Sequence, residues 1–325
     1  MTLFLIRRTL QGAITIFVMS IIVFVGIYAI GNPVEILINP DATPEIKQRA
    51  IEKLGLDKPV LEQYWTFVVR ALQGDLGNSF IYDEPALKLI LEAMPATLEL
   101  AISSMVLALI FGIPLGMIAG YWPNSAASNI IMTGSIFGFS LPSFWVGLML
   151  ILLFSVEMGW LPSGGRGDTV DVLGVELSFL TLDGLQHLFL PALNLALFKI
   201  SLVIRLTRAG MKETMSQDYI KYARAKGLAG SRVVFVHAFR NTLVPLVTVL
   251  GLEMGSVIAF AVVTETVFSW PGMGKLIIDS INLLDRPLIV AYLMLTVLMF
   301  VVINLIVDIT YSVVDPRVRL SEADD

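Results

Sequence analysis

Long apolar runs alternate with polar segments along the chain, and six of these runs are long enough to cross a membrane. A spanning helix needs roughly 20 apolar residues, because each residue adds about 1.5 Å and the hydrocarbon core is about 30 Å thick. The pattern therefore predicts an all-α integral membrane protein with six transmembrane helices. The six runs are Thr9–Ile30, Thr97–Trp122, Ile130–Met158, His187–Leu206, Leu243–Phe268 and Leu288–Tyr311.

The segment between the first two runs is too polar to span. Its apolar positions follow a helical period from Pro44 through Leu54 and again over Leu61–Leu72, and a GDLGNS turn cluster follows. These features predict a small helical cap after the first transmembrane helix. We therefore divide the chain into an N-terminal helix, a cap, a five-helix core and a tail, over 1–30, 31–96, 97–314 and 315–325.

Composition supports a lipid environment. Of the 325 residues, 56% are hydrophobic and 15% are charged, whereas soluble domains carry about 25% charged residues. The chain contains no Cys, which excludes a disulfide framework and thiolate chemistry. The first run follows Arg7 and Arg8 as in a signal peptide, but it is long and no small-x-small cleavage site ends it. We predict a retained helix, with a cleaved signal as the alternative.

The distribution of basic residues predicts the orientation. Cytoplasmic loops carry the excess of Lys and Arg, although this rule weakens in long loops such as 31–96. With six spans and a cytoplasmic N-terminus, both termini and the loop 209–242 are cytoplasmic and the cap is extracytoplasmic. The bases on the cytoplasmic side are then Arg7, Arg8, Arg205, Arg208, Lys212, Lys221, Arg224, Lys226, Arg232, Arg240, Arg317 and Arg319.

The loop 209–242 is basic, amphipathic and interrupted by glycine. Ser216 is a candidate N-cap for a helix whose end is set by Gly227, since glycine adopts positive φ readily. Ser231 is a candidate cap for the next helix. The pattern predicts a helix, a turn and a second helix along the membrane surface, with Tyr219, Tyr222 and Ala223 on one face. Its exposed corner suits a partner's groove, and a basic helix that holds lipid headgroups is the alternative.

Two stretches of this loop, YARAKGL and HAFRNTLVPLVT, resemble the cytoplasmic coupling loop of ABC-importer permeases. More narrowly, nearly the whole chain resembles the first-subunit permeases of the dipeptide/oligopeptide/nickel family. The other motifs that carry this resemblance are RRTLQG, LGLDKPVLEQYW, GDLGNSF, PATLEL, SLPSFWVGLML, GWLPSGG, TETVFSWPGMGKL and INLIVDITYSVVDPRVR.

The resemblance implies a type I ABC-importer permease in the inner membrane of a prokaryote. It implies four partner subunits besides the surrounding lipid: a second homologous permease, two ATP-binding subunits that hold ATP and Mg, and an extracytoplasmic substrate-binding protein. ATP binding would turn the pathway outward and hydrolysis would return it inward, moving peptides or peptide-like solutes into the cytoplasm. Members of the family carry dipeptides, oligopeptides, glutathione, nickel chelates and some sugars, so the solute stays open.

The resemblance also implies which residues couple transport to ATP hydrolysis. The general importer pattern is Glu-Ala-Ala, three further residues and then Gly. Counted back from Gly227, this chain has Lys221, Tyr222 and Ala223, so only the second Ala is kept and the residues that pair with the ATP-binding subunits stay open. The expected coupling residues are Tyr222, Ala223, Arg224, Ala225, Lys226 and Gly227.

Glycine and proline interrupt several of the apolar runs, and a few ionisable residues lie inside them. Small residues let helices pack closely, and proline breaks can open backbone groups toward a cavity. Charges in lipid normally face a cavity or a partner. Glu253 lies roughly 15 Å into its run, so it could meet a peptide's amino group. The predicted pathway residues are Ser140, Pro142, Glu253 and Gly255.

The ionisable residues within the runs also fit roles outside a pathway. Glu253 could instead form an interhelical hydrogen bond to Ser or Thr. Glu265 and Asp308 are predicted to be interfacial, and Lys199 to extend toward the cytoplasm. A proton-coupled secondary transporter that uses these carboxylates is the alternative function.

Catalytic and nucleotide-binding signatures are not found in the sequence. It contains no G-x-x-x-x-G-K-[ST] motif, so a phosphate cradle, and with it ATP, is expected only in partner subunits. His187 and His237 fall on opposite sides of the predicted membrane, so no metal site is expected. No nucleophile has an evident base, which argues against a membrane-embedded enzyme. Aromatic residues near the run ends fit interfacial belts, and no nucleic-acid partner is expected.

Overall fold

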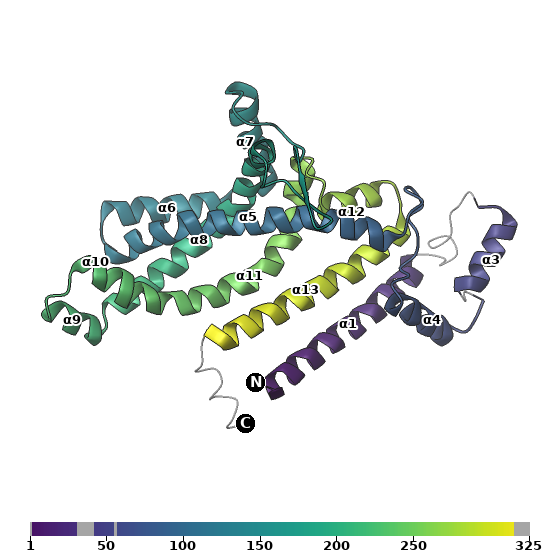
Figure 1. Ribbon diagram of the computed structural model, residues 1–325, viewed down its shortest axis with the longest axis horizontal. Helices are drawn as coiled ribbons and strands as arrows, with labels where there is room; N and C mark the ends of the chain where they lie inside the picture. The colour runs from purple at the N-terminus through teal and green to yellow at the C-terminus, as the bar shows by residue number, and fades with distance from the viewer. Residues whose placement is uncertain (1, 31–41, 55–56, 315–325) are drawn as a thin grey trace. The chain divides into compact units, whose positions relative to one another are not determined.

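The computed structural model describes residues 2–30, 42–54 and 57–314. The predicted tail and the part of the cap over 31–41 lie outside these ranges. The chain is mostly helical (Figure 1). It divides into two compact units, the first made of residues up to Met94 with Gly272–Ile306, and the second of Pro95–Pro271 with the residues from Val307. The division into four segments at these boundaries stays a prediction.

The first unit contains both predicted cap helices, as α3 (Pro44–Leu54) and α4 (Val60–Leu72). Helix α1 (Thr2–Ile30) packs against α4 through Phe24, whose ring centroid lies 5.3 Å from that of Tyr64. The Ser20 hydroxyl hydrogen-bonds the Tyr64 hydroxyl at 2.8 Å. Apolar packing and one polar contact thus hold the first helix on the cap.

A second core of this unit joins the start of α5 (Ala86–Tyr121) to α12 (Met273–Asn282) and α13 (Arg286–Val314). Ala86, Ile90, Met273, Leu288 and Ala291 are buried there. Helix α12 is not among the predicted elements. Its ten residues are too short to span a membrane, so they do not stand out as a long apolar run.

The turn cluster that precedes α5 is tied to a buried carboxylate. Asp285 is fully buried and accepts hydrogen bonds from the Ser79 hydroxyl and from the Phe80 N–H. The same hydroxyl accepts the N–H groups of Ile81 and Tyr82. Ser79, the last residue of GDLGNS, therefore connects the predicted turn to the corner before α13.

The second unit is built around α8 (Leu182–Met215), which packs against α6 (Ala126–Ser140) and α11 (Phe239–Val267). Figure 1 shows these helices running side by side with α5. The remaining elements of the unit are α7 (Ser143–Leu150), η1 (Ile151–Glu157), the antiparallel hairpin β1 (Val170–Val172) and β2 (Val175–Leu177), α9 (Asp218–Ala225), α10 (Gly230–Arg232) and η2 (Val233–Ala238).

Glycines pack α5 directly onto α8 at three consecutive steps of four residues. A Cβ added at Gly112 would lie 2.6 Å from Cβ of Val203, one at Gly116 2.6 Å from Cβ of Thr207, and one at Gly120 2.6 Å from Cβ of Met211. Both partners advance by four residues at each step, so the two helices run parallel. These glycines act in close packing, and α5 is continuous through them.

Among the described residues, five helices are long and apolar enough to span a membrane, and a sixth span results if one bent pair is counted. The bent pair corresponds to the predicted run Ile130–Met158, which is not one straight helix. Its halves, Ala126–Ser140 and Ser143–Glu157, meet at 103°. Leu141 is extended, as the residue before a proline tends to be, and Pro142 caps α7. By contrast, Pro191 lies inside a continuous α8.

Candidate functional site

The loop predicted to couple transport to ATP hydrolysis folds as helix, turn and helix, as expected. Its buried face consists of Ile220 and Ala223, which join a core with Met117 of α5, Met211 of α8 and Val233 of η2. The loop is therefore seated on two of the long helices by apolar contacts. A displacement of the loop would be transmitted directly to these helices.

The outward side of the same loop carries the other predicted coupling residues. Arg224, Ala225, Lys226 and Gly227 are exposed, and 63% of Tyr222 is exposed. The Lys226 ammonium lies 4.5 Å from the centroid of the Tyr222 ring, in cation–π contact. The result is a basic, aromatic corner on a buried apolar base.

The turn itself depends on Gly227. This residue has φ +73°, and its N–H donates to the Arg224 carbonyl at 2.9 Å. The next N–H, of Leu228, donates to the Ala223 carbonyl at 3.3 Å, so the last carbonyls of α9 are satisfied. An added Cβ would meet no atom within 4 Å, so backbone conformation alone favours glycine here.

Two details of the predicted loop are wrong. Ser216 does not cap α9; it ends α8, and its hydroxyl donates to the Glu213 carbonyl at 2.7 Å. Ser231 lies inside α10, whose N-cap is Ala229. On α9 the buried side chains are those of Ile220 and Ala223, whereas Tyr219 and Tyr222 are exposed.

The four predicted pathway residues fall at two places in the second unit. Ser140 and Pro142 are exposed at the bend between α6 and α7. Glu253 and Gly255 lie in α11, where Gly255 is buried and Glu253 is partly exposed. Their role in a pathway stays a prediction.

Glu253 forms an ion pair that the sequence did not predict. Its Oε2 lies 2.5 Å from Nζ of Lys199 on α8, and the Ser256 hydroxyl lies 2.7 Å from the same Nζ and 2.6 Å from Oε2. Lys199 therefore reaches across from α8 to α11. Glu265, predicted to be interfacial, is fully buried and accepts a hydrogen bond from Thr97 at 2.7 Å. The side chain of Asp308 lies outside the described part of the chain.

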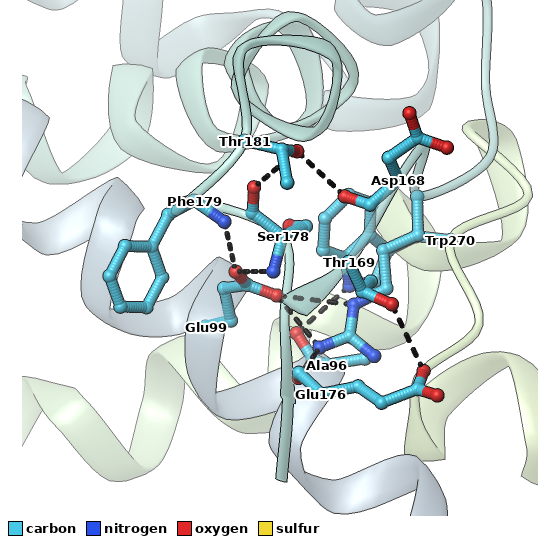
Figure 2. A network of polar contacts seen from close by, with 10 residues as sticks. Ala96, Glu99, Asp168, Thr169, Glu176, Ser178, Phe179, Thr181 and Trp270 are labelled. Carbon is cyan, nitrogen blue, oxygen red and sulfur yellow. Dashed lines mark hydrogen bonds and ion pairs between the residues drawn. The ribbon is translucent and has the colours of Figure 1, made fainter. Parts of the chain in front are cut away.

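A second ion pair fixes the loop that contains the hairpin (Figure 2). Glu99 on α5 is 1% exposed and accepts two hydrogen bonds on each carboxylate oxygen. Its Oε1 accepts the N–H groups of Ser178 and Phe179, both at 2.8 Å. Its Oε2 accepts Nε and Nη2 of Arg166, at 3.2 and 2.9 Å. The loop is thereby attached to the transmembrane part of α5.

Trp270 completes this network from the end of α11. Its Nε1–H donates to the Ala96 carbonyl at 2.9 Å, and its ring centroid lies 5.9 Å from the Arg166 guanidinium carbon. The indole is fully buried. Arg166 also donates to the Glu176 carbonyl of the hairpin at 2.6 Å. Strand β2, helix α5 and the segment that follows α11 therefore share one arginine.

A signal for the Glu99 network was present in the sequence. Glu99 lies within the second apolar run, where an ionisable residue indicates a buried partner. Arg166 is one of the few bases in the short outer loops. Their pairing over 67 residues follows from the packing of α5 against the loop and could not be read from spacing.

Comparisons with known proteins agree along the whole chain. The family described as binding-protein-dependent transport system inner membrane component matches residues 112–320, and the N-terminal membrane component of such systems matches residues 1–101. The di/tripeptide transport system permease protein DppB of Pseudomonas aeruginosa is 40% identical over 330 residues, covering 97% of this chain and 98% of that protein. The glutathione transport system permease protein GsiC of Escherichia coli is 37% identical over 317 residues, with the same coverage.

The fold has a counterpart among solved structures. A chain from the inward-facing MetNI methionine ABC transporter aligns with a TM-score of 0.57 at 16% identity, over 71% of this chain and 99% of that chain. This likeness confirms the predicted type I ABC-importer permease fold. The chain is a multi-pass inner-membrane protein and belongs to the family of binding-protein-dependent transport system inner membrane components, the permease subunits of ABC importers.

Proposed function

We propose that this permease carries peptides or peptide-like solutes, and that separate ATP-binding subunits drive it through the loop 209–242. The solute class rests on the relatives. DppB is a permease for di- and tripeptides, and GsiC is one for glutathione, itself a tripeptide. Solutes with a short peptide backbone are therefore the best supported among those carried by the wider family.

The observation that carries the proposed coupling is the two-sided character of the loop. Ile220 and Ala223 are buried against α5 and α8, while the corner from Arg224 to Gly227 is exposed. A rigid base and a protruding basic corner suit insertion into a groove of an ATP-binding subunit. Tyr222, Ala223, Arg224, Ala225, Lys226 and Gly227 are the residues we assign to this contact.

The proposed complex contains this chain, a second homologous permease, two ATP-binding subunits with ATP and Mg, and an extracytoplasmic binding protein. The positive charge of the loop 209–242 supports its cytoplasmic location and, with an even number of spans, a cytoplasmic location for both termini. The solute would pass between the two permeases, near Ser140, Pro142, Glu253 and Gly255.

A proton-coupled mechanism is the alternative, and the contacts of the carboxylates favour it less. Glu253 is paired with Lys199, and Glu265 accepts a hydrogen bond from Thr97. A carboxylate engaged in such a contact within the protein can relay a proton only after that contact breaks.

Coupling is tested by placing a β-branched residue at the turn. In proteoliposomes that contain the complete transporter, Gly227→Val should preserve assembly but reduce ATP-driven uptake of a labelled dipeptide by about tenfold or more, since a strained backbone of about 1–3 kcal/mol opposes the turn. Gly230→Val is the matched control, because a Cβ added at Gly230 also meets no atom but its φ is not positive. Equal uptake and equal ATP hydrolysis in both variants, or uptake without nucleotide, would contradict the proposal.

A further inference from the structure

The ion pair between Lys199 and Glu253 lies at the centre of its two helices. Glu253 is the middle residue of α11, and Lys199 is one of the two middle residues of α8. About 20 Å of helix therefore extends from Glu253 in each direction. Charged groups at such depth normally face a protein partner or a water-filled cavity, because hydrocarbon does not solvate them.

The pair is accessible from one side. The Glu253 side chain is 30% exposed and that of Lys199 is 12% exposed, although α8 is among the most buried of the spanning helices. Lipid is an unfavourable neighbour for an exposed carboxylate. The open side of the pair therefore suits the space between two permeases, where the solute passes.

The pair also has unused hydrogen-bonding capacity. Both contacts of the Glu253 carboxylate use Oε2, and within the described part of the chain its Oε1 has no hydrogen-bond partner. Lys199 uses two of its three ammonium donors, on Glu253 and Ser256. Glu253 can thus accept from an incoming ammonium group and Lys199 can donate to an incoming carboxylate, before their own contact is broken.

We propose that Lys199 and Glu253 form a binding site for the two charged ends of a zwitterionic solute. The solute ammonium binds Glu253 and the solute carboxylate binds Lys199. Ser256 keeps a hydrogen bond to Lys199 or Glu253 after these two side chains separate. The inference rests on the proposed function and adds the groups that hold the solute within the membrane.

Electrostatics gives this site its selectivity. When a zwitterionic solute binds, two ion pairs with the solute replace the pair between Lys199 and Glu253. No charge is therefore left unpaired at any stage. A solute with only one charge would release one buried group without a partner, and breaking a buried pair in this way is strongly unfavourable. The termini of a dipeptide are separated by about 7 Å or less, a distance that rotation of the long lysine side chain can open.

The surface next to the pair would accommodate solute side chains. Phe260 lies two helical turns beyond Glu253 on the same face of α11 and is 67% exposed. It offers an apolar surface with no specific shape requirement. A site of this kind fixes the termini and tolerates different side chains.

The test uses a neutral double variant, Lys199→Met with Glu253→Gln, in the complete reconstituted transporter. Replacing a buried pair by uncharged residues of similar size is often neutral for stability, whereas removing one partner is not. We expect the double variant to assemble with its partner subunits. Its uptake of a labelled zwitterionic dipeptide should fall by about tenfold or more, equivalent to about 1.4 kcal/mol of lost binding free energy.

A merely structural pair leads to a different result. The single variants would then lose assembly, and the double variant would regain both assembly and uptake. Wild-type uptake by the double variant overturns the inference and leaves the proposed function intact. Failure of the wild-type transporter to accumulate any peptide would instead refute the proposed function.

A second measurement uses the unmodified protein, so it does not depend on how the variants fold. A dipeptide with free termini and a diazirine side chain is photolysed with the complete transporter during turnover. Cross-links to α8 and α11 near Lys199 and Glu253, reduced by excess unlabelled dipeptide, are expected. Cross-links elsewhere in the transporter, with none on these two helices, would overturn the inference.

Discussion

Two ion pairs of the second unit differ in how completely they are satisfied. Glu99 accepts four hydrogen bonds, from Arg166 and from two backbone N–H groups, and it is 1% exposed. Glu253 uses one oxygen, contacts only side chains and is 30% exposed. A carboxylate with every acceptor position filled fixes the backbone around it. A carboxylate with one free oxygen keeps the capacity to bind something else.

Removing the charge of the satisfied pair should have the largest effect. Glu99→Gln leaves the Arg166 guanidinium buried without its counter-ion, which should lower the stability of the folded transporter by about 3–5 kcal/mol. A marked fall in the detergent-solubilised unfolding temperature would report this loss. Glu176→Gln is the control, because the Glu176 side chain is exposed and its bond to Thr169 is 3.4 Å long. Equal unfolding temperatures for the two variants would contradict the structural role of Glu99.

A smaller effect is expected when the charge is kept and the geometry is lost. Arg166→Lys retains a cation beside Glu99 but cannot donate from two positions of one planar group. We expect a loss of about 1.5–3 kcal/mol, the range for a hydrogen bond to a charged group. In the double variant with Glu99→Gln, the loss of stability should be smaller than the sum of the two single losses, because both substitutions remove the same contact. Full additivity in denaturation measurements would show that the two residues act separately.

The smallest effect on stability is expected at the pair between Lys199 and Glu253. Ser256→Ala removes the hydroxyl between Lys199 and Glu253 but leaves their direct contact. We expect a stability change of about 0.5–1.5 kcal/mol and a reduction in dipeptide uptake of only a few fold. Ser104→Ala is a matched control, since it removes a buried hydroxyl that bonds its own helix. A stability loss as large as that of Glu99→Gln would remove the distinction between the two pairs.

The features that could be predicted from the sequence are those set by local pattern. The cap helices, five of the spans and the turn at Gly227 follow from apolar periodicity, run length and the conformational freedom of glycine. Each of these features is set by residues that are close in sequence, from about one helical turn apart to the length of one span. The overall architecture followed from the family resemblance.

The features that the sequence did not predict are the direction of the chain after a break in a helix and contacts between residues far apart in sequence. Hydropathy is the same on both sides of Pro142, so it does not report a bend of 103°. The pairing of Lys199 with Glu253 requires the relative register of α8 and α11. That register is visible only in contacts such as Asn194 Nδ2 to Thr264 Oγ1 at 3.0 Å, and in the close approach of Gly210 to Thr242.

The glycine contacts between α5 and α8 limit how these two helices can move. Gly112, Gly116 and Gly120 interlock with α8, so the two helices cannot slide as pistons unless they separate or shift by a whole step of about 6 Å. A force applied near Met117 and Met211 must therefore rotate both helices together as one rigid body. Helix α8 has 34 residues and is about 51 Å long, so each degree of swing about one end moves the other by about 0.9 Å.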